Sequence, residues 1–155
     1  MPTNVFISFA RENLEQVNSI RALAKNPQHE LEFHDRSELE PVRDKKRAPL
    51  PYQPDDTRAE PIRKMIRGLL RKATKMVVII GETTCESKWV NWEIQTFYAQ
   101  KRNLGGDATN RIKGMFVEGC EETELPRRIE RLGISTMEWD LKAFNRWLKM
   151  NPNQT

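Results

Sequence analysis

The sequence predicts an α/β fold in three layers, with five parallel strands in one sheet and helices on both faces. Strand-like and helix-like segments alternate along the whole chain, as in parallel-sheet proteins. Residues 76–80, MVVII, form a continuous apolar run, which is typical of a parallel strand covered on both faces. The length of 155 residues suits one domain, so we expect residues 1–155 to form a single domain.

The first half of the chain predicts two strands, one helix and one long connection. Residues 4–10, NVFISFA, are β-branched and aromatic and indicate a buried strand. The helix that follows has apolar residues at three- and four-residue steps and ends before Pro27. LEFHD, at 31–35, predicts a second strand. Residues 36–57 hold four prolines and many charges. This segment is too long for an ordinary connection, and we expect it to be a lid or contact loop.

The second half repeats the alternation. A helix capped near Asp56 should bury one face and turn the other outward. The predicted inward residues are Ile62, Met65, Ile66, Leu69, Leu70 and Ala73, and the predicted outward residues are Arg63, Lys64, Arg67, Arg71 and Lys72. After the strand at 76–80 we expect a helix at 87–101, a strand at 112–119, a short helix at 125–132, a strand at 135–139 and a closing helix capped by Asp140. This order is flavodoxin-like.

Composition excludes several classes of protein. The 26 basic and 22 acidic residues give a net charge of +4, which does not favour nucleic-acid binding. No apolar run is long enough to cross a membrane, and MPTNVFISFA does not resemble a signal peptide. Cys85 and Cys120 read as free thiols of a reducing compartment. We therefore predict a cytoplasmic protein without a membrane partner.

Common catalytic motifs are missing. The turn after the first strand has no glycine fingerprint, and the chain contains no phosphate-binding P-loop and no GxSxG elbow. A phosphoacceptor receiver domain would need an aspartate after the third strand, where the sequence reads IIGETT. His29 and His34 have no neighbours at metal-ligand spacing, so we expect no metal site. Cys85 lacks an evident partner base and reads as an ordinary small residue.

The stretch SKWVNWEI, residues 87–94, follows the third strand, where parallel sheets bind ligands. On a helical wheel Val90, Ile94 and Phe97 should face the sheet. Glu93 then lies at the border between core and solvent, which predicts a position at the rim of the ligand crevice. An early-helix acid that interacts with the helix dipole fits the same spacing. Trp92 points nearly opposite to the core, which predicts an exposed contact residue.

Three stretches in the same order resemble the Toll/interleukin-1 receptor (TIR) domain family, specifically compact prokaryotic TIR-like proteins of the Thoeris type. NVFISFARENLEQV is similar to the first strand and helix of the family, and FHDRSELEP to its second strand and the start of its BB loop. MVVIIGETTCESKWVNWEI is similar to the third strand and next helix, with Ser87, Trp89 and Glu93 at the family spacing. The sequence departs from the pattern at Ala10, where a basic residue is common, and at Pro41-Val42, which replace a loop glycine.

The resemblance implies cleavage of the nicotinamide–ribose bond of NAD+, by hydrolysis or cyclisation, in prokaryotic antiviral defence. It assigns Glu93 as the catalytic residue. The substrate-binding positions that it implies are Ser8, Phe9, Ala10, Arg11, Asp35, Arg36, Leu39 and Trp89. Phe9 and Trp89 could stack on the flat rings, and Arg11 or Arg36 could meet the pyrophosphate. NAD+ is then a substrate, and no tightly bound cofactor is expected.

The resemblance also leaves a second function open. TIR domains assemble through the BB loop and neighbouring helices, so the chain could be a non-catalytic interaction module. Self-association through the proline-rich loop and helices, and a downstream effector that binds the nucleotide product, are the expected protein partners. A phosphate-responsive or nucleotide-binding flavodoxin-like protein is the third alternative.

Overall fold

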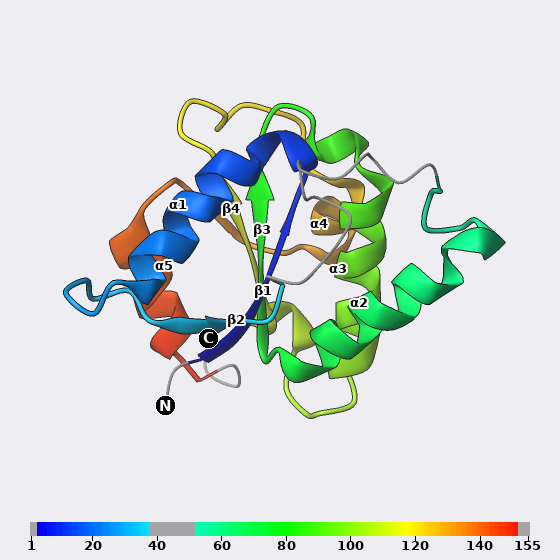
Figure 1. Ribbon diagram of the computed structural model, residues 1–155, viewed down its shortest axis with the longest axis horizontal. Coiled ribbons are helices and arrows are strands. Elements are labelled where there is room, and N and C mark those ends of the chain that lie inside the picture. The colour runs from blue at the N-terminus through cyan, green and yellow to red at the C-terminus, as the bar shows by residue number, and fades with distance from the viewer. Residues whose placement is uncertain (1–2, 38–51, 152–155) are drawn as a thin grey trace.

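The computed structural model describes residues 3–37 and 52–151, which contain one parallel sheet (Figure 1). Its strands are β1 (Thr3–Phe9), β2 (Phe33–Asp35), β3 (Lys75–Ile80), β4 (Ile112–Phe116) and β5 (Thr136–Met137). They lie in the order β2-β1-β3-β4-β5, and every neighbouring pair is parallel. This is the flavodoxin-like order, so the predicted fold class is confirmed.

Helices cover both faces of the sheet. Figure 1 shows α1 (Leu14–Lys25) and α5 (Leu141–Lys149) on one side, and α2 (Glu60–Lys72), α3 (Lys88–Lys101) and α4 (Arg127–Leu132) on the other. Alternate residues of β1 divide between two apolar clusters, because successive strand side chains point to opposite faces. Ile7 packs with α1 and α5, whereas Phe6 packs with α2, α3 and α4.

Side chains cap two of the helices, and the cap at Asp140 was predicted. The Ser87 side chain accepts a hydrogen bond from the Val90 amide at the start of α3. At α5 the Asp140 carboxylate accepts bonds from the amides of Lys142 and Ala143. Each cap satisfies a backbone donor that the first helical turn leaves without an intrahelical partner. These caps fix where α3 and α5 begin.

The predicted faces of α2 are partly wrong. Met65 was expected to be buried but is 52% exposed, and Arg63 was expected to point outward but has a side chain only 13% exposed. The buried line of α2 runs through Ile66 and Leu70. At about 100° per residue, Met65 lies about 100° from Ile66, whereas Arg63 lies only about 60° away on the opposite side.

None of the helices in the described part of the chain has the length and apolar character needed to span a membrane.

Candidate functional site

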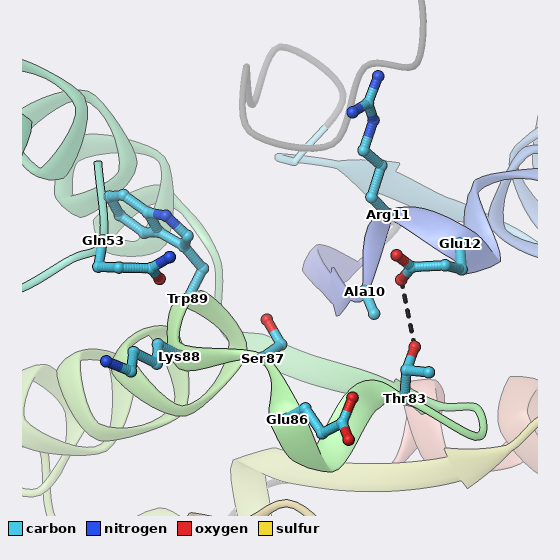
Figure 2. Close-up of a pocket in the computed structure, with 9 residues that line it drawn as sticks. All are labelled: Ala10, Arg11, Glu12, Gln53, Thr83, Glu86, Ser87, Lys88 and Trp89. Carbon is cyan, nitrogen blue, oxygen red and sulfur yellow. Dashed lines mark hydrogen bonds between the residues drawn. The ribbon is translucent and has the colours of Figure 1, made fainter. Parts of the chain in front are cut away.

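A crevice of about 270 Å³ lies at the carboxyl ends of β1 and β3, where the sequence placed the ligand site. Figure 2 shows its walls. The turn after β1 contributes Ala10, Arg11 and Glu12, and Gln53 comes from the segment before α2. The turn after β3 and the start of α3 contribute Thr83, Glu86, Ser87, Lys88 and Trp89.

Two polar contacts join the turns that form the crevice. At the surface the Thr83 hydroxyl donates to the Glu12 carboxylate over 3.2 Å, as Figure 2 shows. Deeper in the protein, the buried Thr84 hydroxyl accepts a bond from the Gly81 amide and lies 3.5 Å from Asn13 Oδ1. These links hold the β1–α1 and β3–α3 turns in a fixed relation.

Gly81 is required by this close approach. A Cβ atom at residue 81 would lie 2.5 Å from Asn13 Oδ1, which is closer than real contacts allow. Sequence reasoning singled out none of Gly81, Asn13 and Thr84. A glycine directly after a buried parallel strand was the available signal, because such a glycine often marks a close approach of another segment.

Trp89 forms a fixed wall of the crevice. Its side chain is 7% exposed, and its indole N–H donates to the Tyr52 carbonyl over 3.2 Å. Its ring packs edge-to-face on Trp92, with centroids 5.6 Å apart. The predicted exposure of Trp92 is wrong: this residue is half-buried against the core, with the Arg67 guanidinium over its ring. The reason is that α2 packs along α3 and covers the side that a single-helix wheel assigns to solvent.

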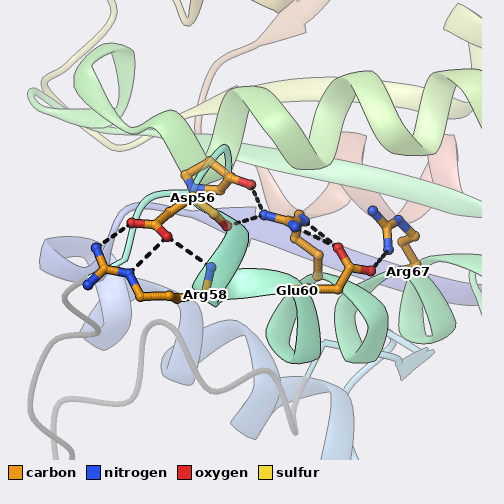
Figure 3. Close-up of polar contacts among 6 residues, drawn as sticks. Asp56, Arg58, Glu60 and Arg67 are labelled. Carbon is orange, nitrogen blue, oxygen red and sulfur yellow. Dashed lines mark hydrogen bonds and ion pairs between the residues drawn. The ribbon is translucent and has the colours of Figure 1, made fainter.

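The segment before α2 is anchored by Arg63. Figure 3 shows the neighbouring ion pairs, Asp56 with Arg58 and Glu60 with Arg67. The Arg63 guanidinium donates to the carbonyls of Pro54 and Asp56 and to the Glu60 carboxylate. Asp56 is itself paired with Arg58, and this hydrogen bonding lowers the pKa of Asp56 to about 2. Arg63 therefore fixes the backbone that carries Gln53 and the Tyr52 carbonyl to the crevice wall.

Ser8 and Glu93 form a buried polar pair beside the crevice. Neither residue has exposed surface, and the Ser8 hydroxyl donates to Glu93 Oε1 over 2.7 Å. Ser8 lies in β1, two residues before Ala10, and Glu93 lies one turn beyond Trp89 along α3. The prediction that Glu93 lies at the crevice rim is therefore wrong. The buried side of α3 is wide, because α2, α4 and the sheet all contact this helix.

Other predicted binding residues lie away from the crevice. Phe9 is 2% exposed and packs in the cluster of α1 and α5, the opposite face from Glu93, with the Arg21 guanidinium over its ring. The Asp35 carboxylate accepts bonds from Arg21 and from the Ser37 hydroxyl.

Arg36 and Ser37 lie just beyond the end of β2. Arg36 Nε donates to Asn4 Oδ1 over 2.8 Å. The buried Ser37, which sequence reasoning did not single out, accepts a bond from the Ile7 amide. Leu39 lies outside the described residues. Of the predicted set, the structure thus gathers Ala10, Arg11 and Trp89 at the crevice, with Ser8 and Glu93 next to it.

The charges around the crevice are mixed. Arg11 and Glu12 lie on the wall formed by the turn after β1, and Glu86 and Lys88 lie on the wall formed by the turn after β3 and the start of α3. Burial, with help from Glu124 and Glu86, raises the pKa of the Cys85 thiol, which disfavours the nucleophilic thiolate. Within residues 3–37 and 52–151 no group of three or more His, Cys, Asp or Glu side chains could hold a metal ion.

Two comparisons with known proteins bear on the identity of this chain. A search of curated proteins found no match. The family model described as Thoeris protein ThsB, TIR-like domain, matches residues 6–106, well over half of the chain. That span begins in β1 and ends just after α3, so it contains the crevice turns and the Ser8–Glu93 pair. The chain therefore belongs to the ThsB TIR-like domain family.

Proposed function

We propose that this protein cleaves the nicotinamide–ribose bond of NAD+ and that Glu93 is its catalytic residue. The observation that carries the proposal is the carboxyl group of Glu93, held by the Ser8 hydroxyl beside a crevice at the carboxyl ends of β1 and β3. Family membership supports the proposal, because many TIR domains catalyse this reaction.

The residues suit the chemistry. Cleavage of the N-glycosidic bond passes through an oxocarbenium-like state, whose positive charge a nearby carboxylate stabilises. The bonding electron pair leaves with nicotinamide, which departs neutral and needs no general acid. An acceptor oxygen or ring nitrogen then bonds to the ribose carbon, and the proton that the acceptor loses passes to solvent. Water as acceptor gives ADP-ribose, a hydroxyl or ring nitrogen of the same nucleotide gives a cyclic product, and another small molecule gives a conjugate.

The crevice residues would orient the substrate. Arg11 and Lys88 supply positive charge for the pyrophosphate, and the wall formed by Trp89 offers a surface for a flat ring. The Ser8 hydroxyl would hold the orientation of the Glu93 carboxylate. Because Glu93 has no exposed surface, contact with the ribose requires the side chains between this residue and the crevice to move apart.

The decisive experiment measures nicotinamide release from NAD+ by the purified protein, alone and in the presence of phage-infected cell lysate. Glu93→Gln should abolish release, since the amide has no negative charge for the transition state. Glu82→Gln is the matched control, because Glu82 is an exposed acid on the same β3–α3 turn and does not line the crevice. Continued turnover by Glu93→Gln would refute the assignment.

The complete burial of Glu93 favours a second candidate, a non-catalytic interaction module in which the Ser8–Glu93 pair only supports the fold. In that case neither the wild type nor any variant would release nicotinamide under either condition. Light scattering would then show self-association, and deletion of residues 41–51 should abolish it. Under both candidates we place the protein in cytoplasmic antiviral defence, and under the first a downstream effector would bind the nucleotide product.

A further inference from the structure

A second cavity lies at the other end of the sheet from the crevice. Its volume is about 410 Å³, within the range of small-molecule sites. It lies where β3 and β4 begin, beside β5 and the second half of α5. Its apolar lining includes Ile112, Met137 and Trp147.

The ionisable residues that line this cavity, Lys75, Lys113 and Arg146, are all cationic. Val77 on β3 packs in the core under α1 and α5, and Lys75, two residues earlier on the same strand, points to the same face. Lys113 on β4 pairs with Val77, so it points to this face as well. Such positions normally carry apolar residues, and a buried charge is costly without a partner of opposite sign. The stability of the fold alone therefore does not explain why two neighbouring strands each carry a lysine at such a position.

Lys75 is partly explained by the fold. Its ammonium donates to the Trp147 carbonyl and, over 2.8 Å, to the Met150 carbonyl, and it lies 4.7 Å from the centre of the Trp147 ring. These contacts cap the carboxyl end of α5, where a cation is favourable. Lys113 donates to a neutral partner, the Ser135 hydroxyl, over 2.6 Å, and has no carboxylate partner within residues 3–37 and 52–151.

The positive charges here are crowded. Burial lowers the pKa of Lys75 to about 8, and the charges of Arg111 and Lys113 act in the same direction. Burial also lowers the pKa of Lys113. An anion in the cavity would relieve both the repulsion and the cost of burial.

We propose that this cavity binds a planar aromatic anion of the size of a nucleoside monophosphate. The ring would pack against Trp147 and Met137, and the phosphate would accept hydrogen bonds from Lys113 and Arg146. The site is separate from the crevice and does not depend on NAD+ cleavage.

The test titrates the protein with three matched probes: adenosine 5′-monophosphate, adenosine and ribose 5-phosphate. Binding is monitored through the indole N–H signals of the four tryptophans in a ¹H–¹⁵N spectrum. Substitution of each tryptophan by phenylalanine assigns the signals. The monophosphate should shift the Trp147 signal at a lower concentration than either fragment, since only it carries both ring and charge. A shift confined to Trp89 would place the nucleotide in the crevice and overturn the proposal, as would the absence of any shift.

Charge-removing variants provide the second arm. Lys113→Gln and Arg146→Gln should each weaken binding of the monophosphate at Trp147 about tenfold, the effect of one charge-assisted hydrogen bond. Arg131→Gln is the control. Arg131 is exposed on α4, on the opposite face of the sheet from the cavity, and its substitution removes the same net charge. Unchanged affinity in both cavity variants, or an equal loss in Arg131→Gln, would overturn the assignment.

Discussion

Removal of the Ser8 hydroxyl should destabilise the protein strongly for so small a change. The bond to Glu93 is 2.7 Å long, and neither residue has any exposed surface, so water cannot replace the lost donor. Hydrogen bonds to charged groups contribute about 1.5–3 kcal/mol, and we expect Ser8→Ala to cost about 2 kcal/mol. For a domain of this size that corresponds to a fall in melting temperature of about 4–8 °C.

A double-mutant cycle with Glu93→Gln measures how much of this cost depends on the charge of Glu93. In Glu93→Gln the amide oxygen can still accept the Ser8 proton, but the bond is weaker because the acceptor is neutral. Ser8→Ala should therefore cost at least about 1 kcal/mol less in the Glu93→Gln background than in the wild type. Urea denaturation followed by circular dichroism gives all four unfolding free energies.

Two results would refute this reasoning. One is a Ser8→Ala variant that unfolds within about 0.5 kcal/mol of the wild type, the usual range of surface substitutions. The other is equal costs of Ser8→Ala in both backgrounds, which would mean that the charge of Glu93 does not strengthen the bond. Nicotinamide release by the same proteins would show whether the pair also matters for turnover.

Three further predictions follow from other contacts. Gly81→Ala should cost about 1–3 kcal/mol through overlap with Asn13, and Asn13→Ala in the same chain should recover part of that loss in urea denaturation; a fully additive double variant would contradict the clash. Arg63→Met should speed amide hydrogen exchange in residues 52–58, whereas Lys64→Met, at an exposed neighbour, should not; equal exchange in both would show that the guanidinium is not the anchor. The pKa of Lys75 is about 8 in the folded protein and 10.5 ordinarily, so between these pH values the unfolded chain binds more protons than the folded one. The stability of the wild type relative to Lys75→Met should therefore rise with pH over this window. A stability difference that does not change with pH would show that folding does not penalise the Lys75 charge.

The sequence predicts the fold well, because the fold depends on regular patterns. The apolar run at 76–80, the helix expected from residue 87 and the cap at Asp140 rest on local signals, and each corresponds to an observed element. The place of the crevice is also predictable, since it lies at the carboxyl ends of the strands, where parallel sheets bind their ligands.

The environment of individual site residues is less predictable, because it depends on neighbours that are remote in the sequence. A helical wheel treats α3 as if it faced only the sheet, and so it placed Glu93 at a rim and Trp92 in solvent. Contact with α2 buries more of α3 than the wheel assumes. The ion pair between Arg21 and Asp35 likewise joins α1 to the end of β2, and the pattern of apolar residues along the sequence does not indicate it.

Because Glu93 is fully enclosed, an enzyme that works through this residue is latent in the described conformation. Its turnover would be the product of an intrinsic rate and the fraction of molecules in which the carboxylate is accessible. An opening that costs about 3 kcal/mol leaves fewer than about 1% of molecules competent. Any event that favours the open form, whether substrate, signal or assembly, could then raise activity about a hundredfold without altering a single catalytic group.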